Sequence, residues 1–366
     1  MLAVVVFAAC LGISLARCRS ALDCSLNGEC LSGLCVCDKP WTGDSCGLLA
    51  YKTTPAIAKS LYNISDPRNT WNGPIVGPVD GIYHIYNCIY NVGSLAGPTS
   101  ILHGVSSTVE GPWDWSSRPN LPTEGGENAA FVTHRNKSSD TTVYSLWIGN
   151  TVRVAESPDG PFNKVENFSY PGDNPAPIYH AKALGGRGAF FMTNQGTETI
   201  YTVEDIVPGA QWRKFAEIDH SALPSSLSPP YYHVEDPFMW IDGHGNWHII
   251  NHAYKNAEYK HCGRSTVSAH FFSTNGKQWH VHPDIEPYGH TVRYNDGTMH
   301  TYTTLERPNM VFSASGVPTH INLAADLVVG DEGCANRTKH AHYGHTPCDN
   351  CKWDDHAGTI LVALEV

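Results

Sequence analysis

The chain has 366 residues, a formal net charge of −11 at pH 7 and a charged fraction of 16%. It contains no basic run that could neutralise phosphate groups, which argues against nucleic acid and anionic membranes as partners. It also lacks a P-loop, a dinucleotide-binding glycine motif and a Gly-x-Ser-x-Gly elbow, so nucleotide chemistry and elbow-type serine hydrolysis are disfavoured.

Residues 1–16 form an apolar run that ends in Ser14-Leu15-Ala16, and this pattern predicts a signal peptide with a small-residue cleavage site. The run is short for a membrane span, and no later run approaches the required length. The alternative for residues 1–16 is a buried N-terminal strand. We therefore expect a secreted or lumenal chain without a membrane span.

Residues 17–47 contain six of the twelve cysteines and few apolar residues. A block this small needs cross-links because it cannot bury a sufficient core, but six cysteines allow fifteen pairings. The cysteine pattern, with Gly28, Gly33 and Trp41-Thr42-Gly43, resembles an EGF-like domain. That resemblance implies the disulfides Cys18–Cys30, Cys24–Cys35 and Cys37–Cys46. The acidic residues of calcium-binding EGF variants are missing before Cys18, so we expect no calcium in this module.

Residues 48–69 are expected to be a linker, and residues 70–330 are predicted to form an all-β domain. Short β-branched and aromatic runs recur there between Gly, Pro, Asn and Asp, and no amphipathic helical stripe is present. One recurring element is a polar Gly- or Pro-containing turn followed by an aromatic residue, at residues 107–115, 155–165, 204–215 and 272–281.

A second element alternates with the first and opens each predicted hairpin with a polar residue, usually before Pro. Its copies are Asn72-Gly73-Pro74, Glu127-Asn128-Ala129, Asn174-Pro175-Ala176-Pro177, Glu235-Asp236-Pro237 and Glu306-Arg307-Pro308. Five units with a period of about 50 residues predict a five-bladed β-propeller in which the first strand of each blade is innermost. The alternative is chance recurrence of such turns in a β protein rich in Gly and Pro.

The stretch from residue 233 to 254 shows how such a unit begins. Glu235 and Asp236 precede Pro237, which is tolerated at the start of a strand, and Asp242-Gly243 lies between two β-prone runs and predicts a tight hairpin turn. We therefore expect the acidic pair at the open end of an inner strand, where the mouths of the hairpins converge on one pocket.

A propeller with Asp-Pro at the mouth of an inner strand resembles the glycoside hydrolase families 32, 43, 62 and 68. The segments VEDPFMWIDGHGNWHIINHAY and LERPNMVFSASGVPTHI are especially similar to secreted family-43-like proteins, and the resemblance covers most of residues 70–325. It implies catalysis by carboxylates on opposite sides of a sugar, with a third acid that tunes the general acid.

The resemblance assigns Asp236 to the third, stabilising acid. Position in the inferred repeat makes Glu306 the candidate general acid and Glu127 the candidate base or nucleophile, with Glu124 as its substitute. The family places its base on the first inner strand, but that strand opens here with Trp71-Asn72-Gly73-Pro74 and carries no carboxylate. This departure favours an alternative in which the propeller binds carbohydrate or protein without catalysis.

Other residues near the predicted mouths suit sugar binding. Aromatic faces stack on sugar rings, which makes Trp71, Trp240, Trp247, Tyr231 and Tyr232 candidates, although each could instead pack between blades. Asn174 could read a hydroxyl group, and Arg307 could line the pocket or pair with Glu235 as a structural bridge. The remaining candidates are His233, His252 and His290, which could bind hydroxyl groups or an axial ion, or be satisfied polar residues. No cofactor is expected, and no residue pattern supports an axial calcium ion.

Residues 331–366 are predicted to close on the propeller and are rich in Cys and His. Cys348-x-x-Cys351 beside histidines could bind zinc, but disulfides suit an oxidising compartment better. Cys88, Cys262, Cys334, Cys348 and Cys351 make an odd number, so their pairing stays open. Glycosylation sequons mark Asn63, Asn136, Asn167 and Asn336.

These patterns together predict a secreted glycoside hydrolase-like protein that acts on or binds an extracellular polysaccharide. The first alternative is a non-catalytic binding propeller, and the second is a structural protein with the EGF-like module as an adhesion element. The sequence does not indicate the oligomeric state.

Overall fold

The computed structural model describes residues 18–62, 69–90, 100–121, 128–136, 139–219, 234–254, 266–282, 285–302, 304–326 and 357–366. Several predictions concern residues outside these ranges. They are the signal peptide 1–16, the sequons at Asn63 and Asn336, Glu124, Glu127, Tyr231, Tyr232, His233, Cys262 and the Cys- and His-rich residues 334–356.

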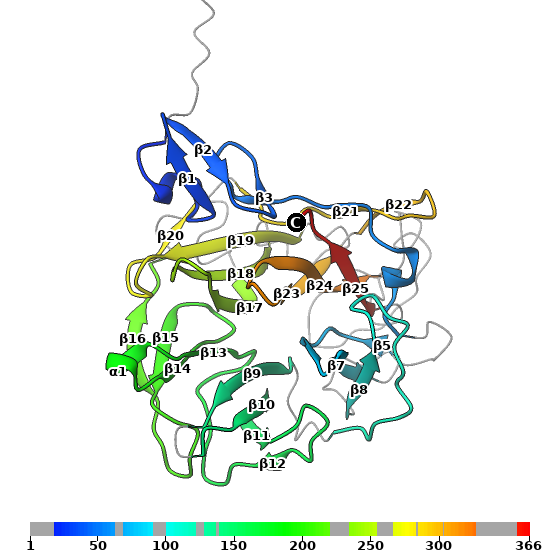
Figure 1. Cartoon of the computed structure of the whole chain (residues 1–366), viewed down its shortest axis with the longest axis vertical. Helices are drawn as coiled ribbons and strands as arrows, with labels where there is room; N and C mark the ends of the chain where they lie inside the picture. The colour runs from blue at the N-terminus through cyan, green and yellow to red at the C-terminus, as the bar shows by residue number, and fades with distance from the viewer. Residues whose placement is uncertain are drawn as a thin grey trace, which may run out of the picture.

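The N-terminal module is a small disulfide-linked unit. It contains η1 (Ala21–Cys24), β1 (Gly28–Leu31), β2 (Leu34–Cys37), β3 (Trp41–Thr42) and β4 (Leu48–Leu49). The structure has the three disulfides that the EGF-like resemblance implies, namely Cys18–Cys30, Cys24–Cys35 and Cys37–Cys46. Figure 1 shows the module in blue at the edge of the propeller, beside β20.

The rest of the described chain is a five-bladed β-propeller, which confirms the predicted fold class (Figure 1). The first blade contains β5 (Asn69–Thr70), β6 (Ile75–Val79), β7 (Ile82–Tyr90) and β8 (Ser100–Ser106). The second contains β9 (Ala130–Arg135), β10 (Thr142–Ile148), β11 (Thr151–Ala155) and β12 (Asn163–Lys164). The third contains β13 (Ala176–His180), α1 (Ala183–Gly186), β14 (Ala189–Thr193), β15 (Thr199–Val203) and β16 (Arg213–Glu217). The fourth contains β17 (Val234–Ile241), β18 (Trp247–Tyr254), β19 (Thr266–Ser273) and β20 (His280–Val281).

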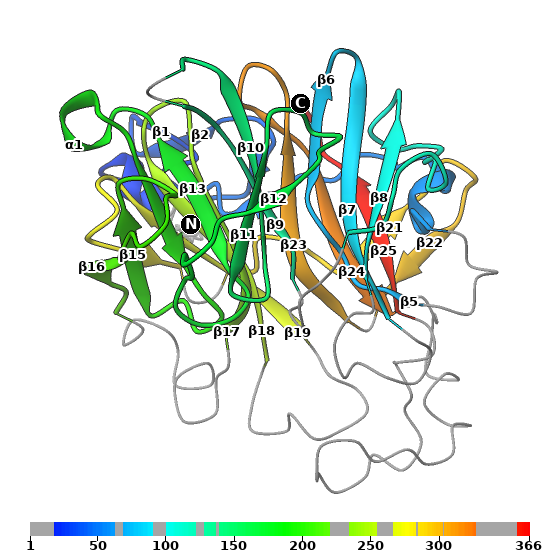
Figure 2. The same cartoon turned by 90° about the horizontal axis from the view of Figure 1, so that it is seen from below.

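The first strand of each blade is innermost, as the second recurring element predicts. In the first blade this edge is shared by β5 and β6, which both pair with β7 (Figure 2). The inner strands line an axial cavity of about 330 Å³. In the fourth blade, the predicted hairpin turn joins β17 to β18, with the Asp242 amide donating to the Asn246 carbonyl.

The first recurring element forms the outer edges of the blades. Its aromatic residues fold back on the blades and pack against apolar clusters between them; they are Trp113, Phe162, Trp212 and Trp279. A Gly or Pro turn followed by an aromatic residue therefore ends a blade because the turn reverses the chain and the ring anchors the last strand to the core.

The fifth blade draws on two separate segments of the chain. It contains β23 (Leu305–Phe312), β24 (Pro318–Asp326) and β25 (Ala357–Ala363). The blade therefore extends beyond residue 330, the expected end of the propeller. β25 pairs with β24 along its whole length, and the Thr359 hydroxyl group on β25 lies within 3.2 Å of Thr70 and Asn87 in the first blade. These buried contacts close the ring.

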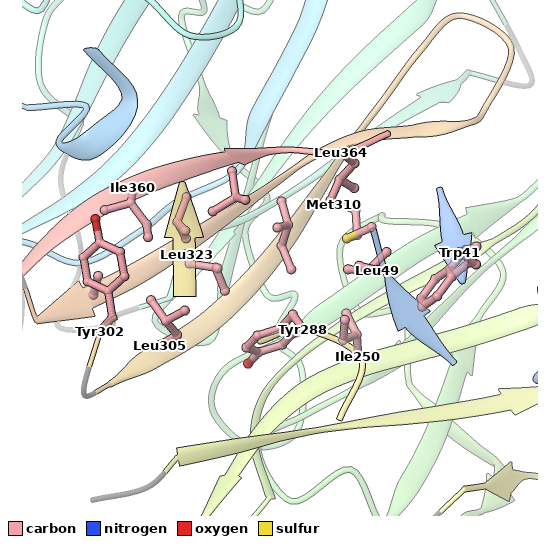
Figure 3. Close-up of a cluster of buried hydrophobic side chains, with 14 of the residues drawn as sticks. Trp41, Leu49, Ile250, Tyr288, Tyr302, Leu305, Met310, Leu323, Ile360 and Leu364 are labelled. Carbon is pink, nitrogen blue, oxygen red and sulfur yellow. The ribbon is translucent and has the colours of Figure 1, made fainter. Parts of the chain in front are cut away.

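The described part of the expected linker packs on the propeller. It includes η2 (Ala56–Lys59), a bridge from Tyr51 to Leu364 and a hydrogen bond from the Leu49 amide to the Pro287 carbonyl. The hairpin of β21 (Thr291–Arg293) and β22 (Met299–Thr301) adjoins it. One apolar cluster runs from Trp41 through Tyr288 to Ile360, so the module and the fifth blade share a core (Figure 3). Within the described ranges, no helix has the length and apolar character that crossing a bilayer requires.

Candidate active site at the propeller axis

Five residues with left-handed backbone, one from each blade, meet at the axis. Their φ angles lie between 37° and 60°, and each is followed by Gly-Pro, Ala or Pro; we call Asn72, Asn128, Asn174, Asp236 and Arg307 the axial ring. Asn and Asp tolerate this conformation best, whereas it strains Arg. In the fourth and fifth blades the strand register shifts at these positions, so the proline that follows falls at a bulge, where no ladder hydrogen bond is lost.

Asp236 is the acceptor at the centre of the axial ring. Asn128 and Asn174 each donate their Nδ2 group to Asp236 Oδ1 at 2.6 Å. Arg307 donates Nε to Asp236 Oδ2 at 3.2 Å. Asn72 completes the ring by donating Nδ2 to the Arg307 carbonyl. The carboxylate therefore connects residues of four blades.

A second group of charged residues, which we call the acid layer, directly precedes the axial-ring residues in sequence. Glu235 and Glu306 occupy these positions in the fourth and fifth blades, and His252 of β18 lies between them. His252 Nε2 is 3.6 Å from Glu235 Oε2 and 3.9 Å from Glu306 Oε2, while His252 Nδ1 is 3.4 Å from Asp236 Oδ2. Glu235 Oε2 and Glu306 Oε2 both lie close to His252 Nε2. The distance between these two oxygens therefore cannot exceed the sum of 3.6 Å and 3.9 Å.

Burial and charge act in opposite directions on the titration of this site. Burial raises the pKa of Asp236 to about 6, although the charges of Arg307 and His252 work against this. Burial by itself lowers the pKa of His252, but the carboxylates of Glu306, Glu235 and Asp236 outweigh it and raise that pKa above its usual value. The imidazole therefore tends to stay protonated among the acids.

Most of the candidates that the structure describes come together here. Asp236, Glu306, Asn174 and Arg307 belong to the site, and the Arg307 guanidinium lies 5.5 Å from the centre of the buried Trp71 ring. Gln195 donates Nε2 to Glu235 at 2.8 Å.

The other described candidates lie elsewhere. Trp240 lines the axial cavity and stacks on His248, with ring centres 4.9 Å apart. Trp247 packs edge-on against Phe191 between the third and fourth blades, so the interblade alternative is the one observed for it. His290 contacts the Tyr302 carbonyl beside β21 and β22.

The two described sequons are accessible. Asn167 is exposed, and Asn136 is partly exposed at the end of β9. Each therefore has a side chain in contact with solvent.

Sequence reasoning used the repeated acid position for Glu127 and Glu306 but missed Asp173, which precedes Asn174 in the third unit. Read across blades, the second recurring element places an acid before the axial-ring residue in Glu127-Asn128, Asp173-Asn174, Glu235-Asp236 and Glu306-Arg307, while the first blade has Trp71-Asn72. Alignment of the units shows this repeated position, and the structure brings its members Glu235 and Glu306 together beside His252. The role of His252 has no such signal, because it lies on a second strand and is recruited only by folding.

The site fits an axial calcium ion poorly. Ligand atoms of Glu235, Asp236 and His252 lie within 4.8 Å of one another. The Asp236 oxygens, however, already accept from two amides and a guanidinium, and the positive charges of Arg307 and His252 would repel a cation. The arrangement is better suited to acid–base or hydrogen-bonding chemistry, in which a buried imidazolium balances neighbouring carboxylates.

Neither a protein-family model nor a curated protein sequence matches the chain. Among solved structures, the catalytic domain of a GH62 α-L-arabinofuranosidase from Coprinopsis cinerea matches with a TM-score of 0.51 and 10% identity, covering 87% of this chain and 98% of the enzyme domain. A glycosyl hydrolase from Bacteroides ovatus matches with a TM-score of 0.50 and 10% identity, covering 86% and 93% of the two chains. The protein therefore shares the five-bladed propeller fold of these two glycoside hydrolase structures.

Proposed function

We propose that this protein is a secreted, carbohydrate-active propeller that hydrolyses glycosidic bonds in an extracellular polysaccharide at the mouth of its axis. The observation that carries the proposal is the gathering of Glu235, Asp236 and Glu306, from two blades, around one buried imidazole. Carboxylates brought together in this way are the groups that glycoside hydrolysis requires.

The proposed roles follow from what each carboxylate contacts. Asp236 stabilises, because the amides and the guanidinium of the axial ring hold it as an acceptor. Glu306 is the general acid, since it belongs to the acid layer and holds the position before the axial ring in the blade that follows Asp236. Glu127 would supply the base or nucleophile; it lies outside the described residues, and its position before Asn128 corresponds to that of Glu306 before Arg307.

The test is hydrolysis of polysaccharides by the purified full-length chain and by Glu306→Gln. Arabinose-containing polysaccharides are the first choice, because the Coprinopsis cinerea structure is named as an arabinofuranosidase. We expect Glu306→Gln to lower the release of reducing ends by about a hundredfold or more, the usual contribution of a general acid. Glu217→Gln is the matched control, since Glu217 is 69% exposed and pairs with Lys214 on the surface. Hydrolysis by Glu306→Gln within about twofold of the wild type would rule out the assigned role.

A second candidate function is binding without turnover, and Trp71 favours it. This residue stands in the first blade where the other four blades carry an acid, and it lies against Arg307. A glycan array separates the candidates, because retained glycans with no released sugar support binding alone. Release of sugar from the retained glycans supports hydrolysis.

A further inference from the structure

A cluster of metal-ligating side chains lies outside the axial site, at the junction of the first and second blades. His84 on β7 and His103 on β8 are 2% and 1% exposed, and their Nδ1 and Nε2 atoms are 3.0 Å apart. Asp159, in the turn between β11 and β12, places Oδ1 at 3.7 Å from His84 Nδ1. All three ligand atoms lie within 4.8 Å of one another.

We propose that His84, His103 and Asp159 form a binding site for a divalent transition-metal ion of the Zn²⁺ type. Zn²⁺ binds imidazole nitrogen and carboxylate oxygen at about 2.0–2.2 Å, so tetrahedral ligands lie roughly 3.3–3.6 Å apart. The observed separations of 3.0 and 3.7 Å bracket that spacing. Two ligands come from one blade and the third from its neighbour, so a bound ion would join the blades, with water as fourth ligand.

The two imidazoles are suited to bind a cation. Both rings are almost completely buried, which disfavours the charged form of an imidazole. In the contact between them, one imidazole donates an N–H hydrogen bond to the other. The donating imidazole can instead carry its proton on its other ring nitrogen. Both facing nitrogens then offer lone pairs to a metal ion, and neither ring loses a proton.

A second histidine pair in the fourth blade shows what distinguishes this cluster. His248 on β18 and His270 on β19 occupy the equivalent strand positions and have the same 3.0 Å contact between Nδ1 and Nε2. There the acid, Asp242, contacts His248 Nε2 at 3.2 Å, on the opposite side of the ring. Those three groups form a hydrogen-bonded chain, whereas in the first blade Asp159 and His103 converge on the same nitrogen.

Tyr86 holds the turn that carries Asp159 next to His84 and His103. The Tyr86 hydroxyl group donates to the Pro158 carbonyl, and the Tyr86 ring stacks on His103 with ring centres 4.6 Å apart. Asp159 is 44% exposed, which gives an ion a route from solvent. Arg118 donates Nε to Asp159 Oδ1 at 2.5 Å, so this guanidinium competes with a cation for the carboxylate.

The experiment is a Zn²⁺ titration of the full-length chain after treatment with a chelator. Four variants are compared with the wild type: Asp159→Asn, His103→Asn, Arg118→Ala and the matched control His270→Asn. We expect affinity at this site to fall by more than about tenfold in the first two, to rise in Arg118→Ala and to stay unchanged in His270→Asn. Asp159 is exposed, so its variant keeps the test valid even if His103→Asn fails to fold.

Substitution with Co²⁺ separates this site from any site in the Cys- and His-rich C-terminal residues. A nitrogen and oxygen ligand set gives visible d–d bands without the near-ultraviolet charge transfer of thiolate ligands. Loss of such bands in Asp159→Asn, together with loss of the Zn²⁺-induced rise in melting temperature, supports the proposal. Equal Zn²⁺ affinity and equal Co²⁺ spectra in the wild type and Asp159→Asn overturn it, as does an equal loss in His270→Asn.

Discussion

Asp236 connects four blades because both of its oxygens are used. Two asparagine amides share one oxygen and a guanidinium holds the other, while the carboxylate itself is almost fully buried. A buried charge is stable only when it is paired and hydrogen-bonded, and the axial ring meets both conditions. The same contacts hold Asp236 in one orientation beside His252 and the acid layer.

Asp236→Asn tests this role. The new amide can turn its oxygen toward Asn128 and Asn174, but its NH₂ group then faces Arg307 Nε, which is also a donor. We expect a loss of about 3–5 kcal/mol in the free energy of unfolding, measured by urea denaturation at neutral pH. Asp140→Asn serves as the control, because Asp140 is 84% exposed in its pair with Arg135. A loss as small as that of the control would contradict the role of the ring.

Two buried histidines should act on the pH dependence of stability with opposite signs. Burial holds the pKa of His270 well below its usual value, so the unfolded chain takes up this proton first and stability is lost as the pH falls below about 6.5. The pKa of His252 is raised, so its contribution is present below about 6.5 and is lost as the pH rises through the folded-state pKa.

We therefore expect His270→Asn to reduce the fall in unfolding free energy on acidification, and His252→Asn to increase it. Urea denaturation at a series of pH values on both sides of about 6.5 measures how the free energy of unfolding of each variant changes with pH. Identical slopes in the two variants would show that these histidines do not titrate as their surroundings indicate.

At the scale of single residues, the sequence is informative where a residue stands in a short motif. The prediction for Asp236 rests on Asp-Pro at the mouth of a strand, and the prediction for Glu306 rests on the matching position one blade later. The partners of Asp236 were not identified as such, because Asn128 and Arg307 reach it only when the ring closes. Trp247 shows the converse limit, since a tryptophan near a predicted mouth has the same local sequence whether it faces the axis or a neighbouring blade.

At the scale of elements, the alternating units were predictable because each is a local hairpin with its own turn signals. β25 was not assigned to the propeller, since its pairing with β24 joins residues that are far apart in sequence. Its side chains from Ile360 to Ala363 are all fully buried, and Leu361 packs in the cluster between the fifth and first blades. This strand therefore supports the contact that completes the ring.

Leu361→Ala should destabilise the whole propeller. Removing a fully buried leucine side chain leaves a cavity and costs about 2–5 kcal/mol. Val366→Ala is the control just beyond the strand, because Val366 is 61% exposed and should change stability little. Thermal unfolding of both variants gives the comparison, and equal melting temperatures would mean that β25 does not stabilise the fold.

At the scale of the molecule, the N-terminal module shares its core with the propeller. Trp41 is 6% exposed and stacks on His270 of the fourth blade, with ring centres 5.1 Å apart. The cluster in Figure 3 continues from Trp41 and Leu49 into the fifth blade. The EGF-like spacing predicted the module and its cross-links, but contacts between separate units leave no local pattern, so the packing of the linker on the propeller could not be predicted.

Trp41→Ala tests whether the two parts unfold together. Loss of a buried tryptophan in a shared core should cost about 3–5 kcal/mol and lower the main melting transition of the propeller. Leu34→Ala, at a residue that is 50% exposed on the module surface, should leave that transition in place. A module that merely hangs from the propeller would give the same calorimetric transition in both variants.

The two-part fifth blade has a consequence for how the protein is made. The first four blades can form as each leaves the ribosome, because their strands follow one another along the chain. The inner edge of the first blade, however, can contact Thr359 only after β25 has been made. Until residue 363 emerges, the nascent protein is therefore an open arc whose first and last blades are uncovered on the sides that later meet. Chaperones that meet the chain during translation should bind that arc, and a ribosome stalled before β25 should hold them longest.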